Sequence, residues 1–296
     1  MYSIFRFAVV GLLATVLRAD LRVVGSDLLG LEFTRAFYEF SGRNGLPLAL
    51  ALDGSRPGWE EFKAGRADLA LIVLPPEEAA PLASFRTRPL GYHSIVVLVP
   101  ADCPLERITL AQLAAVFGTN AEAGSRAGLR WSELGVAGEW GGAFVAAVAP
   151  ESGEGITTEY FRAAVLRGRE LKSNVQRYAA GAELLRHFGG DSRAMALAPM
   201  APAGAKNIKV LRVAAGVSDA GVAPTPETLH AATYPLRLPL QLVFRPDRAP
   251  ALTRLFEFLF GEIAAQLLER AGVTPLPALV RQAQLPSTGP GEKTRK

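Results

Sequence analysis

The chain has 296 residues, of which 49% are hydrophobic and 20% are charged, and its formal net charge is +4. This composition is typical of a globular protein with one large or two medium domains, and the net charge is too small to imply a nucleic-acid partner, so none is expected. Cys103 is the only cysteine, which excludes a disulfide within the chain and a cysteine-based metal cluster.

Residues 1–19 have the pattern of a secretory signal. Arg6 ends a short basic region, residues 7–17 are apolar but too short to span a bilayer comfortably, and Ala19 could precede the cleavage site. The alternative is a buried first strand or helix of a cytosolic protein. Because residues 21–24 supply a separate first strand, we expect export to the periplasm or secretion, without stable membrane insertion after signal removal.

The next part of the chain alternates short apolar runs with amphipathic runs. The pattern predicts strands over 21–24, 46–52, 68–74 and 94–99, and helices over 28–41 and 59–64. Strand, glycine turn and helix in regular alternation favour an α/β fold with largely parallel sheets.

The second half continues the same pattern. It predicts helices over 108–117, 157–167 and 183–188, and strands over 144–148 and 194–198. Residues 233–244 contain Pro235 and Pro239, so we expect an edge or crossover strand there. Residues 249–271 predict one long helix, and the polar residues from 282 onward predict a disordered tail.

Three glycine- and serine-rich loops, at 25–27, 54–58 and 151–156, each follow a predicted strand and precede a predicted helix. Such a turn presents free backbone N–H groups and the positive end of the helix dipole, so it suits an anion. In the third loop, however, Glu154 puts a carboxylate where an anion would dock. The pattern indicates anion-binding loops that have lost part of their ligand set.

Several segments in register carry a family resemblance. They are Val24-Gly25-Ser26-Asp27, Asp53-Gly54-Ser55 with Gly58, 65–70, 108–117, 131–134, Glu151-Ser152-Gly153-x-Gly155, Tyr234-Pro235-Leu236 and 271–277. Over residues 20–281 they resemble the phosphate-binding (PstS-like) proteins of ABC uptake systems, which have the type 2 periplasmic binding protein fold. The resemblance implies two lobes, 20–95 with 231–281 and 96–230, joined by two crossover strands, and leaves the tail at 282–296.

The resemblance also implies a ligand site, in which the family's phosphate ligands are only partly retained. The implied ligand-binding residues are Ser26, Asp27, Ser55, Ser152, Gly153, Glu154 and Gly155. Apolar residues replace family ligands at Leu28, Val73, Leu74 and Ile156, and the arginine before the third loop is absent. A dehydrated phosphate needs many donors and commonly an arginine fork. We therefore expect weak or altered anion binding.

The expected function is that of a non-catalytic extracytoplasmic solute-binding protein, with a small-molecule or oxyanion ligand and an ABC transporter permease as partner. The alternative is an envelope interaction module with a vestigial cleft. No catalytic residues, cofactor or metal site are expected. His93, His187 and His230 lack metal-ligand spacing, and Ser152 is not in a Gly-x-Ser-x-Gly elbow.

Overall fold

The structure is a computed structural model that describes residues 20–74, 84–119, 128–151, 156–179, 181–190 and 192–285. The predicted signal at 1–19 and residues 152–155 of the third loop lie outside these ranges. So does the chain after Leu285.

Six of the described strands form the first sheet, in the order β13-β4-β12-β3-β1-β2. Their bounds are β1 Leu21–Gly25, β2 Leu48–Ala51, β3 Leu69–Val73, β4 Arg86–Ser94, β12 Arg237–Phe244 and β13 Val273–Pro275. β1 is parallel to β2 and β3, whereas β12 is antiparallel to both of its neighbours. Segments from both ends of the chain therefore build this lobe.

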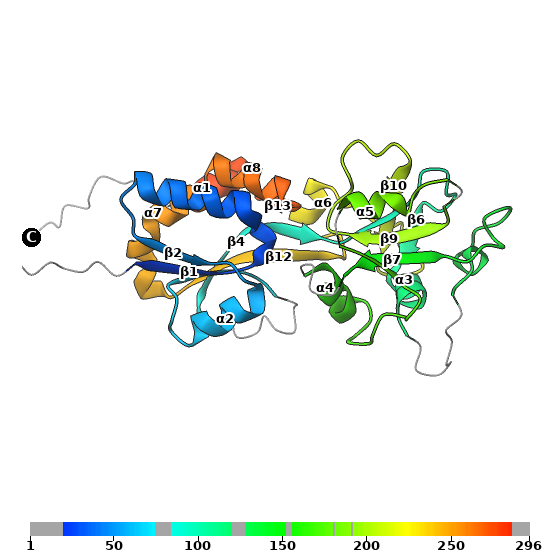
Figure 1. Cartoon of the computed structure of the whole chain (residues 1–296), viewed down its shortest axis with the longest axis horizontal. Coiled ribbons are helices and arrows are strands. Elements are labelled where there is room, and N and C mark those ends of the chain that lie inside the picture. The colour runs from blue at the N-terminus through cyan, green and yellow to red at the C-terminus, as the bar shows by residue number, and fades with distance from the viewer. Residues whose placement is uncertain are drawn as a thin grey trace, which may run out of the picture.

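Helices cover both faces of the first sheet. α1 (Gly30–Arg43) and α8 (Glu262–Arg270) lie on one face and α2 (Ser55–Lys63) on the other, as Figure 1 shows. Phe37 of α1 stacks on Phe258 of α7 (Ala249–Leu259) with ring centroids 4.7 Å apart. The last described helix is α9 (Ala278–Ala283). Buried aromatic contacts of this kind add to the apolar area that the two helices remove from water.

A second sheet forms the other lobe, with described strands in the order β10-β5-β9-β7-β8. Their bounds are β5 Val96–Pro100, β7 Ala146–Pro150, β8 Gln176–Tyr178, β9 Ala194–Ala198 and β10 Ile208–Val210, and a separate pair joins β6 Arg107–Thr109 to β11 Arg212–Ala214. Its helices are α3 Leu110–Phe117, α4 Thr157–Ala164, α5 Gly181–Arg186 and α6 Pro226–His230. Of the helices described in either lobe, none is long and apolar enough to cross a membrane.

Two of the described chain segments connect the lobes. β4 belongs to the first sheet and β5 to the second, so the chain crosses at Ile95, and it returns between α6 and β12. The Ile95 N–H donates to the carbonyl oxygen of Leu236 at 2.9 Å, and the Tyr234 hydroxyl donates to the Ile95 carbonyl oxygen at 2.6 Å. The two segments are thus hydrogen-bonded to each other. Figure 1 shows the two lobes that they connect, and the predicted two-lobed α/β fold is confirmed.

Three predicted elements differ in the structure. Residues 233–244 are predicted to be an edge or crossover strand; the chain does return between the lobes just before β12, but β12 itself is central, between β4 and β3. Pro239 is tolerated because β3 pairs with β12 only from Leu240 onward, so no donor to β3 is lost there. The predicted helix over 249–271 breaks at Gly261, whose backbone is extended. α2 begins at Ser55 rather than at Trp59, because Pro57 is accommodated in a first helical turn.

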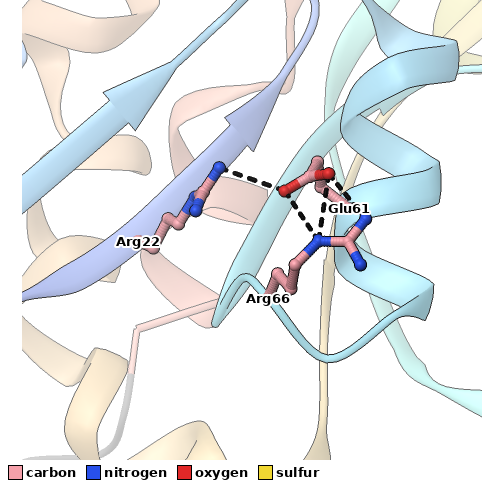
Figure 2. Close-up of polar contacts among 3 residues, drawn as sticks. All are labelled: Arg22, Glu61 and Arg66. Atoms are coloured by element: carbon pink, nitrogen blue, oxygen red, sulfur yellow. Dashed lines mark hydrogen bonds and ion pairs between the residues drawn. The ribbon is translucent and has the colours of Figure 1, made fainter.

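An ion-pair cluster ties the start of β1 to α2. Glu61 accepts hydrogen bonds from Arg22 at 3.1 Å and from Arg66 at 2.7 Å, as Figure 2 shows. The hydrogen bond from Arg66 is the main cause that lowers the pKa of Glu61. All three side chains are partly exposed, so the cluster adds little to stability. The cluster is not part of the first predicted loop, because Arg22 lies near the start of β1 and that loop follows the end of β1.

Candidate functional site

The first predicted loop is held by a glycine. Gly25 ends β1 at φ 147°, and a Cβ there would lie 2.0 Å from the Leu71 carbonyl oxygen. This close approach lets the Ser26 N–H donate to the same oxygen at 2.7 Å. The buried Ser26 hydroxyl accepts from the Leu28 N–H at 3.3 Å and so begins a short 3₁₀ helix, Asp27–Leu29. Contacts within the protein therefore fix the conformation of this loop without a ligand.

The second loop packs directly on the first. The Gly54 N–H donates to the Gly25 carbonyl oxygen at 2.9 Å, and a Cβ on Gly58 would lie 2.7 Å from Gly25. The Ser55 hydroxyl accepts from the Val73 N–H at 2.9 Å and ties the start of α2 to the end of β3. Ser26 and Ser55 thus each stabilise the first lobe through a hydrogen bond that the hydroxyl accepts, and each hydroxyl can still donate its own proton.

A hollow of about 260 Å³ opens where these loops face the other lobe. We call it the interlobe hollow; its lining residues are Ser26, Asp27, Gly54, Ser55, Arg56, Pro57, Ile156 and Glu159. α2 starts within this lining. Ile156 is the N-cap residue of α4, in the second lobe, and its side chain makes no capping hydrogen bond. Two helix N-termini, one from each lobe, therefore contribute to the hollow.

An ion pair joins the lobes across the interlobe hollow. The Arg56 guanidinium donates to a carboxylate oxygen of Glu159 at 2.9 Å, although the two residues are 103 positions apart in the chain. The Arg56 side chain is 53% exposed and that of Glu159 is 39% exposed. With Asp27, the described lining has two carboxylates and one guanidinium, which gives it a formal net charge of −1.

A second polar contact between the lobes is buried. The His93 ring on β4 lies with Nε2 3.2 Å from the Thr157 hydroxyl oxygen at the start of α4, and both residues are buried. Burial lowers the pKa of His93 to about 4, so the ring is neutral at pH 7. His93 Nδ1 is buried without a hydrogen-bond partner. This histidine therefore adds no positive charge for an anion.

The structure brings together three of the predicted site residues and leaves the others undescribed. Ser26, Asp27 and Ser55 all line the interlobe hollow. Ser152, Gly153, Glu154 and Gly155 lie outside the described residues. Sequence reasoning missed Arg56 and Glu159, although Arg56 directly follows Ser55 in the second loop and Glu159 lies in the first turn of the helix after the third loop.

Two apolar replacements lie in the core rather than in the hollow. Val73 and Leu74, where the resemblance would place a polar residue and an arginine, are 0% and 4% exposed. Both pack in an apolar part of the first lobe. Among the residues that the structure describes, no three His, Cys, Asp or Glu side chains gather in a way that could hold a metal ion.

Comparisons with known proteins give a consistent result. A family model described as a PBP superfamily domain matches residues 18–262. The phosphate-binding protein PstS of Pseudomonas aeruginosa is 22% identical over 206 residues, which cover 68% of this chain and 63% of that relative. The match thus spans less than two thirds of the curated relative's length.

Three solved structures with names from phosphate binding or transport share this fold. An ABC-type phosphate transport receptor from Vibrio cholerae superposes with a TM-score of 0.66 at 17% identity, over 87% of this chain and 100% of that one. PstS from Borrelia burgdorferi gives a TM-score of 0.66 at 14% identity, over 87% and 99% of the two chains. A possible phosphate binding protein from Planctomyces limnophilus gives 0.70 at 20% identity, over 90% and 95%. At these identities the similarity establishes the fold.

Proposed function

The chain belongs to the PBP superfamily, whose domain model matches residues 18–262, and on that premise we propose that it is a non-catalytic solute-binding protein that works outside the cytoplasm. Its ligand is a small molecule or oxyanion bound between the lobes, and phosphate binds weakly or not at all. The lobes of this proposal are residues 20–95 with 231–281, and residues 96–230. The partner is an ABC transporter permease, in keeping with the similarity to the ABC-type phosphate transport receptor of Vibrio cholerae.

The observation that carries the proposal is the ion pair across the interlobe hollow. Glu159 places a carboxylate 2.9 Å from the guanidinium of Arg56, which is the cation that an incoming oxyanion would need. An oxyanion that bound Arg56 would lie close to Glu159. Two like charges about 4 Å apart repel by roughly 4 kcal/mol at an effective dielectric constant of about 20. Micromolar affinity corresponds to about 8 kcal/mol, so this repulsion alone would remove much of it.

The chemistry of the hollow supports binding rather than catalysis. A serine nucleophile needs a base within hydrogen-bond distance. Among the described residues, the Ser26 and Ser55 hydroxyls accept hydrogen bonds from the backbone N–H groups of Leu28 and Val73. The described lining of the hollow contains no histidine or cysteine. A site with this lining can orient a ligand by charge and hydrogen bonds.

The two connecting segments support a closing motion. Only Ile95 and the segment before β12 cross between the two main sheets in the part of the chain that the structure describes. A few residues at such a connection can absorb the backbone rotation of a hinge. Arg56 and Glu159 meet at the side where the lobes would close, so a ligand that replaced one partner of this pair would couple binding to closure.

The proposal is tested by a thermal-shift screen of the purified chain against phosphate, other oxyanions, sugars and amino acids. A ligand that binds only the folded state raises the melting temperature, and the stabilisation grows with the logarithm of its concentration once that concentration exceeds Kd. We expect at least one compound to raise it, and phosphate to raise it less than that compound does.

A matched pair of variants locates the binding. Ile156→Trp fills the interlobe hollow, whereas Ile263→Trp enlarges a side chain that is 60% exposed on α8. The ligand-induced shift should vanish in the first variant and persist in the second, with the unliganded melting temperature of each measured beside it. A screen without any stabilising compound would overturn the proposal and favour an interaction module with a vestigial cleft.

A further inference from the structure

The charges in the interlobe hollow restrict the choice of ligand more than the volume of the hollow does. Its described lining contains Asp27, Arg56 and Glu159 as formal charges, and Arg56 already pairs with Glu159 across the lobes. Exposed ion pairs contribute little to stability, so a ligand can displace this one at small cost. A ligand that breaks this pair must suit the charges of both of its side chains.

Three classes of small ligand differ in how they meet this requirement. A simple anion pairs with Arg56 but leaves Glu159 and Asp27 facing a like charge. A simple cation pairs with Glu159 but leaves Arg56 facing a like charge, and it lies near two helix N-termini that disfavour positive charge. A zwitterion gives each side chain of the pair a new partner of opposite charge.

We propose that the ligand is a small zwitterion, with a phosphonate, phosphate or carboxylate group at one end and an ammonium group a few atoms away. This inference rests on the proposed function. The anionic group pairs with Arg56 at the start of α2, within reach of the Ser26 and Ser55 hydroxyls that line the same hollow. The ammonium group pairs with Glu159. The volume of about 260 Å³ lies below the range of pockets for drug-sized ligands, about 300–1,000 Å³, and so fits a small compound.

The test compares two compounds that differ by one ammonium group, 2-aminoethylphosphonate and ethylphosphonate, by titration calorimetry. The wild-type chain should bind the aminoethyl compound about tenfold more tightly, and ethanolamine, which carries only the ammonium, should bind more weakly than either. The titrations are repeated at two pH values, so that the protonation of the phosphonate itself is not mistaken for recognition of the ammonium.

Two variants assign the preference to the ion pair. Glu159→Gln removes the proposed partner of the ammonium, and the ratio of the two affinities should fall to about threefold or less. Glu257→Gln is the matched control, because it breaks an ion pair with Arg254 on α7, away from the hollow. It should leave the ratio unchanged.

Each outcome separates this inference from the proposed function. If ethylphosphonate or phosphate binds the wild-type chain as tightly as 2-aminoethylphosphonate, the zwitterion inference is wrong and the solute-binding function stands. If the tenfold preference survives in Glu159→Gln, the ammonium is recognised elsewhere and the inference is also wrong. If none of these compounds binds and the wider screen is blank, both are overturned.

Discussion

The buried contact between His93 and Thr157 predicts how the stability of the chain depends on pH. Burial lowers the pKa of His93 from 6.5 to about 4. Below pH 6.5 the unfolded chain binds a proton at this residue, whereas the native chain does so only near pH 4. The free energy of unfolding therefore falls as the pH drops through this window.

The magnitude follows from the size of the shift. Each unit of pKa difference corresponds to about 1.4 kcal/mol, so a value lowered from 6.5 to about 4 corresponds to roughly 3 kcal/mol when fully developed. Between pH 7 and pH 4.5, most of the window is crossed, and His93 should account for a loss of about 2 kcal/mol.

Urea denaturation at pH 7 and pH 4.5 measures this loss. In His93→Gln, which cannot titrate but keeps a group able to hydrogen-bond Thr157, the drop between the two pH values should be smaller than in the wild-type chain by about 2 kcal/mol. His187→Gln is the control, since His187 does not share this contact, and its drop should equal that of the wild type. Equal drops in the wild type and His93→Gln would refute the reasoning.

Three further predictions concern the loop, the lobe connection and the cysteine. Gly25→Ala should destabilise the chain by at least about 3 kcal/mol in urea, because its Cβ would lie 2.0 Å from the Leu71 carbonyl oxygen; a loss below 1 kcal/mol would contradict the close approach. Tyr234→Phe removes a buried hydrogen bond to Ile95 and should cost about 1–2 kcal/mol, whereas an unchanged urea midpoint would show that this bond adds nothing. Cys103 is buried, and burial raises the pKa of its thiol, so a disulfide reagent followed by absorbance should label it slowly in the native state and rapidly in urea; equal rates would disprove its burial.

Much of the fold could be predicted because local patterns and long-range packing agree. The glycine that ends β1, the serines of the first two loops and the alternation of strand and helix indicated an α/β fold with anion-binding loops, and Ser26, Asp27 and Ser55 do line one hollow. Those loops are short, and their residue types are the ones that such turns require, as at Gly25 with its φ of 147°. The sequence could therefore predict the loops, although Leu71 and Val73, which fix them, lie farther along the chain.

Other features depend on contacts that a single stretch of sequence cannot reveal. β4, Arg86–Ser94, contains charged residues, a proline and a glycine, and it is a strand because β12 and β13 pair with it from far along the chain. Its burial therefore comes from its neighbours. Arg56 and Glu159 belong to different lobes, 103 positions apart, and each alone is an ordinary exposed charge at a helix start. Only the folded chain makes them a pair.

The central claim is that Glu159 opposes the binding of phosphate in the interlobe hollow. It is tested most directly by calorimetric titration of the wild-type chain with phosphate at pH 7, beside the variant Glu159→Gln. Because Glu159 pairs with Arg56 in the interlobe hollow, the account predicts that phosphate binds the wild type with a Kd well above about 1 µM and binds the variant at least about tenfold more tightly. A wild-type Kd at or below about 1 µM, unchanged in Glu159→Gln, would contradict it.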